Sequence, residues 1–216
     1  MNNKKVTVLD FGMCNLLNMV RAFEHIGCTV EVTESPDVAR QANRLVVPGV
    51  GAFKHCIEEL KSRDLDQGIA EFIASQRPFL GVCVGMQMLF EQSSEFGSFE
   101  GLGLLKGRVE RIADHDTDGQ VQGVPHIGWN NLVTPESGRN WQGSLLDEFA
   151  GKTPAMYFVH SFAATPTDES IRLADCVYGG HRVCAAVETG NVMATQFHPE
   201  RSGPMGLKIL QRFVNC

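Results

Sequence analysis

Long apolar runs are absent from this sequence of 216 residues. No stretch approaches the roughly 20 apolar residues that a membrane-spanning helix needs, and the longest candidate, residues 79–90, is interrupted by glycine and glutamine. The N-terminal residues lack the apolar segment and the small-residue cleavage site of a secretory signal. These absences argue against a membrane protein, and we expect a cytoplasmic one.

Positive charge is also scarce. Lys and Arg number 19 against 25 Asp and Glu, which gives a net charge of −6, and no run of basic residues exceeds two. Proteins that bind nucleic acid or an anionic membrane usually carry an excess of basic residues. Neither is therefore expected as the main partner.

The seven cysteines include no C-x-x-C pair, so zinc ribbons and thioredoxin-like chemistry have no support. An odd number of cysteines at irregular spacing, without an export signal, is typical of reduced thiols in a cytosolic protein. We predict neither a metal site nor a cofactor, and we expect most of these thiols to be small buried apolar groups.

The sequence does have an ordinary globular composition, with 43% apolar and 20% charged residues. Its length favours a single domain over residues 1–216. In the first half, strand patterns alternate with helical patterns, which is typical of βαβ units and a parallel sheet. The expected strands cover 5–12, 28–32, 44–49 and 78–82, and the expected helices cover 15–27, a segment from about 53, 65–76 and 85–93.

After Gly101 the pattern changes to strands, one of which is expected over 155–163, and a closing helix follows over 203–216. Two of the strands flank Gly190-Asn191, a pair that favours a hairpin turn. Residues 113–123 and 134–143 are expected to be surface loops. We therefore predict an α/β fold with a mostly parallel central sheet, helices on both faces, and additional antiparallel strands in the C-terminal half.

The segment Gly81-Val82-Cys83-Val84-Gly85 stands where a strand pattern changes to a helix pattern, as in a nucleophile elbow. Two glycines suit so tight a turn because a Cβ there would collide with the neighbouring backbone. The turn would expose the sulfur at the carboxyl edge of the sheet, and a helix N-terminus would favour the thiolate. The Val84 N–H would be free to bind an oxyanion. Taken alone, the motif is about as consistent with a buried structural cysteine.

A nucleophile also needs a base, and one of the seven histidines suits that role. His198 and Glu200 lie two apart at the end of an apolar strand pattern, where both side chains would point the same way. A carboxylate beside an imidazole fixes its tautomer and stabilises the imidazolium. Without Cys83, a chance His-Pro-Glu turn would be the simpler interpretation.

Together the elbow and the His-Pro-Glu motif resemble those of the class I (triad) glutamine amidotransferases. Further segments are similar to the glutaminase subunits of imidazole glycerol phosphate synthase, in the same order and over nearly the whole chain. They are residues 10–16, 46–53, 124–130, 157–162 and 194–203.

The resemblance implies roles for individual residues. Cys83 would be the nucleophile, His198 the acid–base and Glu200 the group that orients it. The oxyanion donors would be the N–H of Val84 and one from the Val50–Gly51 loop. The glutamine pocket would be lined by Gln87, Ser161 and Phe162.

The resemblance also implies a heterodimer in which a (β/α)₈-barrel cyclase receives the ammonia, and no cofactor. The side chains expected to face this partner are Pro125, His126, Trp129, Asn130 and Asn15.

Three residues depart from the family pattern. Tyr is usual where Phe11 and Phe162 stand, and Gly is usual where Cys14 stands. The identity of the partner is therefore open, and a related glutaminase that serves another synthase, for example one that aminates a surface sugar, is an alternative. A stand-alone cysteine hydrolase and a non-catalytic interaction subunit are the others; the presence of all three triad residues argues against the last.

Overall fold

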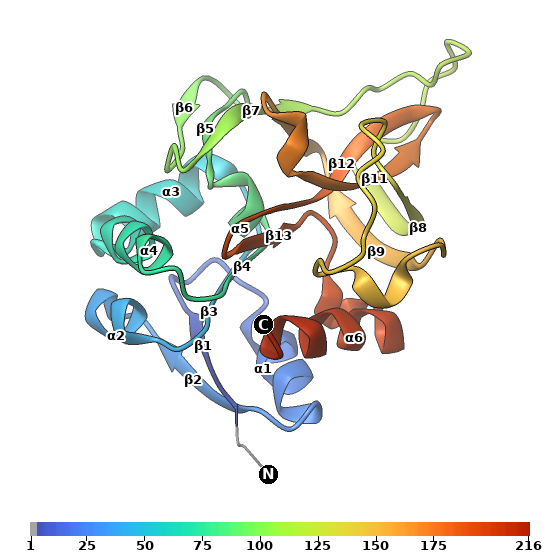
Figure 1. Cartoon of the computed structure of the whole chain (residues 1–216). Coiled ribbons are helices and arrows are strands. Elements are labelled where there is room, and N and C mark those ends of the chain that lie inside the picture. The colour runs from blue at the N-terminus through green and yellow to red at the C-terminus, as the bar shows by residue number, and fades with distance from the viewer. Residues whose placement is uncertain (1–3) are drawn as a thin grey trace.

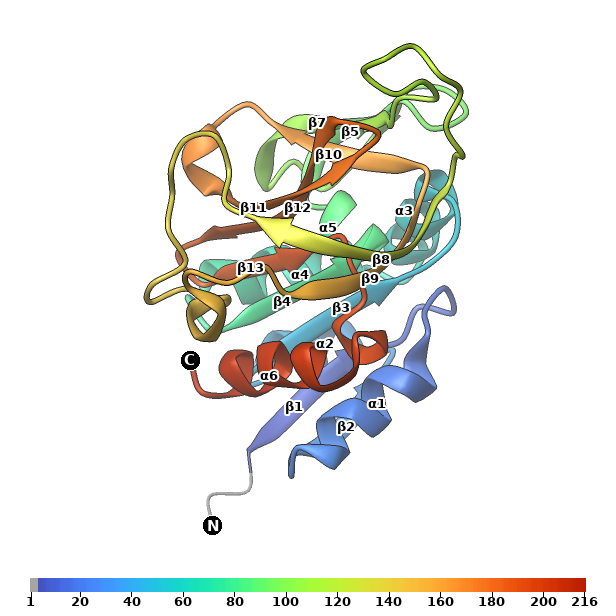
Figure 2. The same ribbon diagram turned by 90° about the vertical axis from the view of Figure 1, so that its right-hand side faces the viewer.

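The computed structural model describes residues 4–216; residues 1–3, the first of the predicted 1–216 domain, lie outside the described residues. A twisted central sheet runs through the molecule, helices pack on both of its faces, and a smaller sheet lies above one end (Figures 1 and 2). The predicted α/β fold is confirmed.

One half of the central sheet is parallel. It contains β1 (Lys5–Leu9), β2 (Thr29–Thr33), β3 (Leu45–Gly49), β4 (Phe79–Cys83) and β13 (Val192–Thr195). They lie in the order β2-β1-β3-β4-β13, with parallel pairing throughout. Every residue of β3 and β4 is buried, as expected for parallel strands covered on both faces.

The other half is antiparallel. It contains β12 (His181–Thr189), β11 (Arg172–Tyr178), β8 (His126–Val133) and β9 (Ala155–His160), in that order beyond β13. The predicted hairpin is present, since β12 and β13 are antiparallel and joined through Gly190-Asn191. This half ends at the edge strand β9. Strands β8 and β9 lie on the side of the molecule that faces the viewer in Figure 2.

The helices cover both faces of the sheet. On one face lie α1 (Leu16–His25) and α6 (Gly203–Val214); on the other lie α2 (Pro36–Gln41), α3 (Phe53–Ser62) and α4 (Leu65–Ala74) (Figure 2). Four of these confirm the sequence prediction. The short α2 was not predicted; Ser35 caps it by accepting the Val38 N–H at 3.5 Å.

The smaller sheet corrects two predictions. It consists of β10 (Phe162–Pro166), β7 (Leu105–Arg111), β5 (Phe90–Ser93) and β6 (Phe99–Glu100). The helix predicted over 85–93 is wrong, because α5 (Val84–Gln87) is a single turn and the chain then enters β5, where pairing with β7 outweighs the helical spacing. The single strand expected over 155–163 is interrupted at Ser161, where the chain passes from one sheet to the other.

The remaining regular structure is three short 3₁₀ helices, η1 (Asp147–Phe149), η2 (Glu169–Ile171) and η3 (Pro199–Arg201). The 134–143 loop is anchored rather than loose, because the buried Trp141 indole donates to the Leu173 carbonyl at 2.8 Å. Within residues 4–216, no helix has the length and apolarity to cross a bilayer.

The tight turn after β4 depends on close backbone contacts between β3, β4 and α5. A Cβ on Gly85 would lie 1.9 Å from the Val47 carbonyl oxygen, and one on Gly81 would lie 2.8 Å from the Gly85 oxygen. On β3, a Cβ on Gly49 would lie 2.9 Å from the Gly85 nitrogen. These backbone atoms cannot move aside without shifting a strand, so the glycines are a steric requirement.

We predict that Gly85→Ala destabilises the folded chain by at least about 3 kcal/mol, at or beyond the upper range for overpacked cores. Gly123→Ala is the matched control, since a Cβ there meets only the Tyr178 hydroxyl at 3.7 Å and φ is not positive. Urea unfolding of both variants would measure the difference. Equal stability of the two variants would show that the close approach is absent.

Candidate active site

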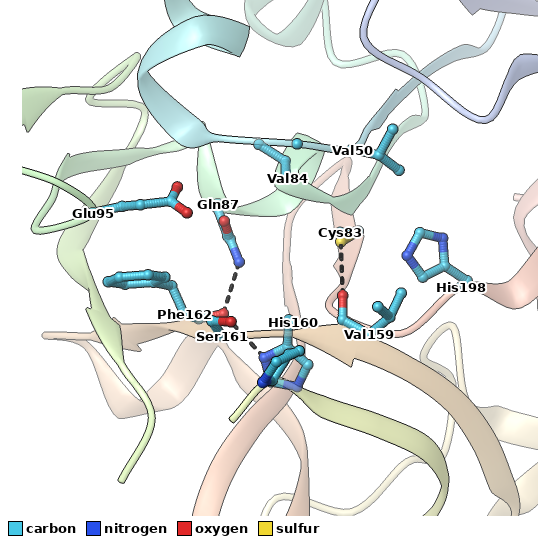
Figure 3. Close-up of a pocket in the computed structure, with 12 residues that line it drawn as sticks. Val50, Cys83, Val84, Gln87, Glu95, Val159, His160, Ser161, Phe162 and His198 are labelled. Atoms are coloured by element: carbon cyan, nitrogen blue, oxygen red, sulfur yellow. Dashed lines mark hydrogen bonds between the residues drawn. The ribbon is translucent and has the colours of Figure 1, made fainter. Parts of the chain in front are cut away.

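A cavity of about 270 Å³ opens at the carboxyl end of β4 (Figure 3). Apart from Glu200, it brings together every residue predicted as catalytic, oxyanion-binding or glutamine-binding. Segments from distant parts of the chain therefore converge where open α/β sheets bind ligands. The lining residues are Val50, Gly51, Cys83, Val84, Gln87, Glu95, Pro125, Val159, His160, Ser161, Phe162 and His198.

Cys83 has the strained backbone of an elbow, with φ +56° and ψ −113°. A non-glycine residue rarely adopts this conformation, which turns the side chain out of the strand. Its sulfur lies 4.0 Å from the Val159 carbonyl oxygen and 3.6 Å from Gln196 Nε2. Because α5 is only four residues long, its dipole favours the thiolate less than the predicted longer helix would.

His198 and Glu200 form a buried pair in which Nδ1 and Oε1 are 2.8 Å apart. The predicted reason for this contact is wrong. The strand ends at Thr195, and the chain turns through η3, which places the carboxylate beside the imidazole. Glu200 also accepts a 3.5 Å hydrogen bond from Asn15, a residue expected at the partner face.

The carboxylate of Glu200 engages one nitrogen of the His198 imidazole, Nδ1. Since a carboxylate can only accept, Nδ1 carries the hydrogen, and Nε2 has no hydrogen-bond partner among residues 4–216. Burial alone would lower the pKa of His198, but the neighbouring Cys83 and Glu200 raise it to about 10. The imidazolium is therefore retained at neutral pH beside the sulfur.

The two sides of the expected oxyanion hole differ in this structure. Val84 is the first residue of α5, where a helix leaves the N–H without an intrahelical acceptor. On the opposite loop, the Val50 N–H donates to the Met13 carbonyl at 2.8 Å, and the Val50 carbonyl accepts a 3.6 Å contact from the Cys56 thiol. Both polar groups of Val50 are thus engaged away from the cavity.

Two cavity residues with polar side chains, Glu95 and His160, were not predicted from the sequence. The Glu95 carboxylate lies at the end of the cavity occupied by Gln87 and accepts the Phe53 N–H at 2.6 Å (Figure 3). A carboxylate there suits a cationic group such as an amino-acid ammonium. His160 lies in the cavity wall (Figure 3). The sequence has no motif around Glu95, and the resemblance over residues 157–162 implies no role for His160; strand pairing brings both side chains to the cavity.

His160 is joined to His126, which is 3% exposed and therefore does not present its imidazole to a partner as predicted. His160 Nδ1 lies 3.0 Å from the Phe162 carbonyl, and His160 Nε2 lies 3.2 Å from His126 Nδ1. A carbonyl can only accept, so His160 carries its hydrogen on Nδ1 and accepts from His126 Nδ1–H. Burial lowers the pKa of His126 to about 4 and that of His160 to about 3. Both rings are therefore neutral.

The other residues predicted to face a partner differ in exposure. Pro125 is exposed and Trp129 is 59% exposed, on a strand whose neighbours are partly buried. Trp129 packs edge-on against Tyr157 at 6.1 Å between ring centroids. Asn130 is half-buried and donates to the Val177 carbonyl at 2.8 Å. Tryptophan is enriched at protein–protein interfaces, so this exposed indole is consistent with an interaction surface.

The residues that depart from the family pattern fit without strain. Phe11 is fully buried, where a phenol would need a partner. Cys14 is outside the left-handed backbone region, and its thiol donates to Asp10 at 3.4 Å. Within residues 4–216 there is no group of three or more His, Cys, Asp or Glu side chains arranged to hold a metal ion.

Known proteins resemble this chain over nearly its whole length. The family model for glutamine amidotransferase class-I matches residues 7–216. The chain is 43% identical to imidazole glycerol phosphate synthase subunit HisH 1 of Legionella pneumophila (strain Lens), over 97% of this chain and 98% of that protein. It is 44% identical to subunit HisH of Syntrophotalea carbinolica, over 96% and 98% of the two chains.

The solved structures support the fold alone. A crystal structure of glutamine amidotransferase superposes with a TM-score of 0.72 at 17% identity and covers 97% of each chain.

We predict that Glu200→Gln lowers the pKa of His198 from about 10, because the variant removes a negative charge that stabilises the imidazolium. A folded-state pKa above the unfolded value of 6.5 stabilises the fold fully below pH 6.5, and this contribution is lost as the pH rises through 10. Glu200→Gln loses part of this pH-dependent stabilisation. Titration of the histidine ring signals by NMR measures the shift, with the exposed Glu148→Gln as control. An unshifted His198 would exclude the pairing.

We also predict that His126 and His160 both appear in ¹⁵N NMR spectra as neutral rings with hydrogen on Nδ1. His160 Nδ1 must donate to the Phe162 carbonyl, so His160 Nε2 accepts from His126 Nδ1 at 3.2 Å. No other placement of the two ring hydrogens is consistent with these contacts. The signals are expected to persist unchanged down to about pH 5. A ring with hydrogen on Nε2, or one that titrates near pH 6.5, would contradict this arrangement.

Proposed function

The chain belongs to the class I glutamine amidotransferase family, and on this premise we propose that it is the glutaminase subunit of an imidazole glycerol phosphate synthase. It hydrolyses glutamine to glutamate and ammonia and passes the ammonia to a cyclase partner in histidine biosynthesis, in the cytoplasm. The observation that carries the chemistry is Cys83 in one cavity with the buried His198–Glu200 pair. The names of the 43–44% identical relatives support the synthase assignment.

In the first half of the reaction, the Cys83 thiolate attacks the side-chain amide carbon of glutamine. The electrons of the C=O bond move to oxygen, and the tetrahedral intermediate collapses as the C–N bond breaks. His198, held as imidazolium, gives its Nε2 proton to the departing nitrogen, so that ammonia leaves and a thioester remains.

In the second half, the neutral His198 takes a proton from water, which attacks the thioester carbon. Collapse of the second intermediate breaks the S–C bond and releases glutamate. Glu200 keeps the imidazole in the Nδ1–H tautomer in both halves without transferring a proton.

The cavity has the groups needed to hold glutamine. Gln87 Nε2 is fully used by the Phe162 carbonyl at 2.8 Å and by Gln196 Oε1 at 2.9 Å, which leaves its own oxygen to accept from the substrate. The Glu95 carboxylate would pair with the α-ammonium. The Ser161 hydroxyl is left for the α-carboxylate, and the loss of a Tyr hydroxyl at Phe162 removes no contact of the backbone there.

The Val50–Gly51 loop would act as the switch. The Val50 N–H is bound to Met13 instead of facing the sulfur, and a missing oxyanion donor slows comparable reactions by roughly 10²–10³. The glycines that flank Val50 would allow a peptide rotation that brings an N–H to the oxyanion. We expect this rotation to occur only with the (β/α)₈-barrel partner bound and loaded with its substrate, which would avoid unproductive glutamine hydrolysis.

A related glutaminase that serves another synthase is the second candidate, because Cys14 occupies a position where the family usually has glycine, near the expected interface. It shares the chemistry and differs in the partner that activates it. The assay that tests the first candidate therefore also tests the second.

We predict low glutaminase activity of the purified chain alone and activation by about 10²–10³ when a candidate cyclase and its nucleotide substrate are added. Glutamate release is the measurement, and Cys83→Ala is the inactive control. Trp129→Ala is expected to weaken activation without changing basal hydrolysis, because its exposed indole lies outside the cavity. Val32→Ala, also exposed but on the opposite edge of the sheet, is the matched control.

Activation by a different synthase but not by the cyclase would favour the second candidate. Full activity of the isolated chain would instead indicate a stand-alone hydrolase.

A further inference from the structure

Gln196 is a completely buried polar residue next to the reactive sulfur, and the chemistry described above does not use it. It is 0% exposed and lies two residues before His198. Its Nε2 is 3.6 Å from Cys83 Sγ, and its Oε1 is 2.9 Å from Gln87 Nε2. Burial of an amide side chain lowers the stability of the fold unless its polar atoms form hydrogen bonds.

The direction of each hydrogen bond is fixed by one backbone atom. The Phe162 carbonyl can only accept, so the atom of Gln87 that lies 2.8 Å from it must be the amide nitrogen. That nitrogen is also 2.9 Å from Gln196, so the Gln196 atom facing it must be the oxygen. The remaining Gln196 atom, directed at the sulfur of Cys83, is therefore the NH₂ group.

The sulfur consequently receives a donor. The Val159 carbonyl, which could accept a thiol hydrogen, is at 4.0 Å, a longer contact than the 3.6 Å from Gln196. An N–H aimed at sulfur favours the thiolate over the thiol. The single-turn α5 offers little help from its dipole, which leaves the imidazolium of His198 and this amide as the groups that favour the charged sulfur.

We infer that Gln196 is a catalytic residue that donates a hydrogen bond to the Cys83 thiolate, and that Gln87, anchored on the Phe162 carbonyl, sets the direction of this donation. The inference rests on the proposed function for the role of Cys83 as nucleophile. Gln87 then has a second role besides lining the cavity. One of its amide hydrogens bonds to the Phe162 carbonyl, and the other orients Gln196.

The test is the pH dependence of Cys83 alkylation by iodoacetamide, followed by mass spectrometry of the Cys83 peptide so that the other six thiols do not interfere. Gln196→Met keeps the length of the side chain and removes the donor. We expect the midpoint of its alkylation curve to move up by about one to two pH units, the size of a hydrogen bond to a charged group. Gln211→Met, on the exposed side of α6, is the matched control.

Gln87→Met supplies the second arm. It frees the Gln196 amide to rotate, so its midpoint is expected to move in the same direction by a smaller amount. The double variant is expected to match Gln196→Met alone, because Gln87 acts on the sulfur only through Gln196. With glutamine as substrate, Gln196→Met should lower kcat and leave KM nearly unchanged, since Gln196 does not line the cavity.

An unshifted midpoint in a cooperatively folded Gln196→Met protein would overturn the inference. If Gln196→Met fails to fold, an unshifted alkylation midpoint in Gln87→Met would overturn the inference instead. Alkylation requires neither glutamine nor a partner. A chain with the expected midpoints but no glutamine hydrolysis, even with the candidate cyclase and its nucleotide substrate added, would therefore contradict the proposed function and leave the contact between Gln196 and the sulfur standing.

Discussion

The contact on which the site depends is the approach of α5 to β3, where a Cβ on Gly85 would lie 1.9 Å from the Val47 carbonyl. This approach allows the chain to reverse directly after β4, and the reversal holds Cys83 at φ +56°. It also fixes the proposed nucleophile relative to the proposed oxyanion loop, because Gly49, which ends β3, touches the first turn of α5 as well. Cys83 and the Val50–Gly51 loop are thus positioned by close contacts between main-chain atoms, which leave little room for adjustment.

The base reaches the sulfur through the order of the strands. Because β13 pairs with β4 in parallel, with Thr195 opposite Val82, the residues that follow both strands meet at the same edge of the sheet. Gln196 lies next to the sulfur immediately beyond the strand, and η3 then returns Glu200 to the imidazole of His198. One strand pairing therefore brings the proposed base and the inferred thiolate donor to the proposed nucleophile.

The sequence predicts the parts of the site that are determined by residues close together along the chain. Glycines two residues before and after Cys83 indicate a turn that excludes Cβ atoms, and the His198-Pro-Glu200 segment is short enough to predict the contact, although the strand geometry used to explain it is wrong. The four-residue α5 was mistaken for a longer helix because β5 forms only by pairing with β7, which is distant in the sequence. Glu95, His160 and Gln196 were missed for the same reason. The burial of His126, stacked at 4.1 Å on Tyr178, likewise depends on a strand far along the chain.

Residues 10–16 contact both the Val50–Gly51 loop and the Glu200 carboxylate. The Met13 carbonyl holds the Val50 N–H at 2.8 Å, and Asn15 donates to Glu200 at 3.5 Å, close to the limit for a hydrogen bond. The other Glu200 oxygen is buried without a partner among residues 4–216, so the carboxylate would gain from a closer amide. Both contacts start from one short loop, which begins where β1 ends and leads into α1. Under the proposed mechanism, a displacement of this loop that released Val50 would also change the contact of Asn15 with the carboxylate proposed to orient His198.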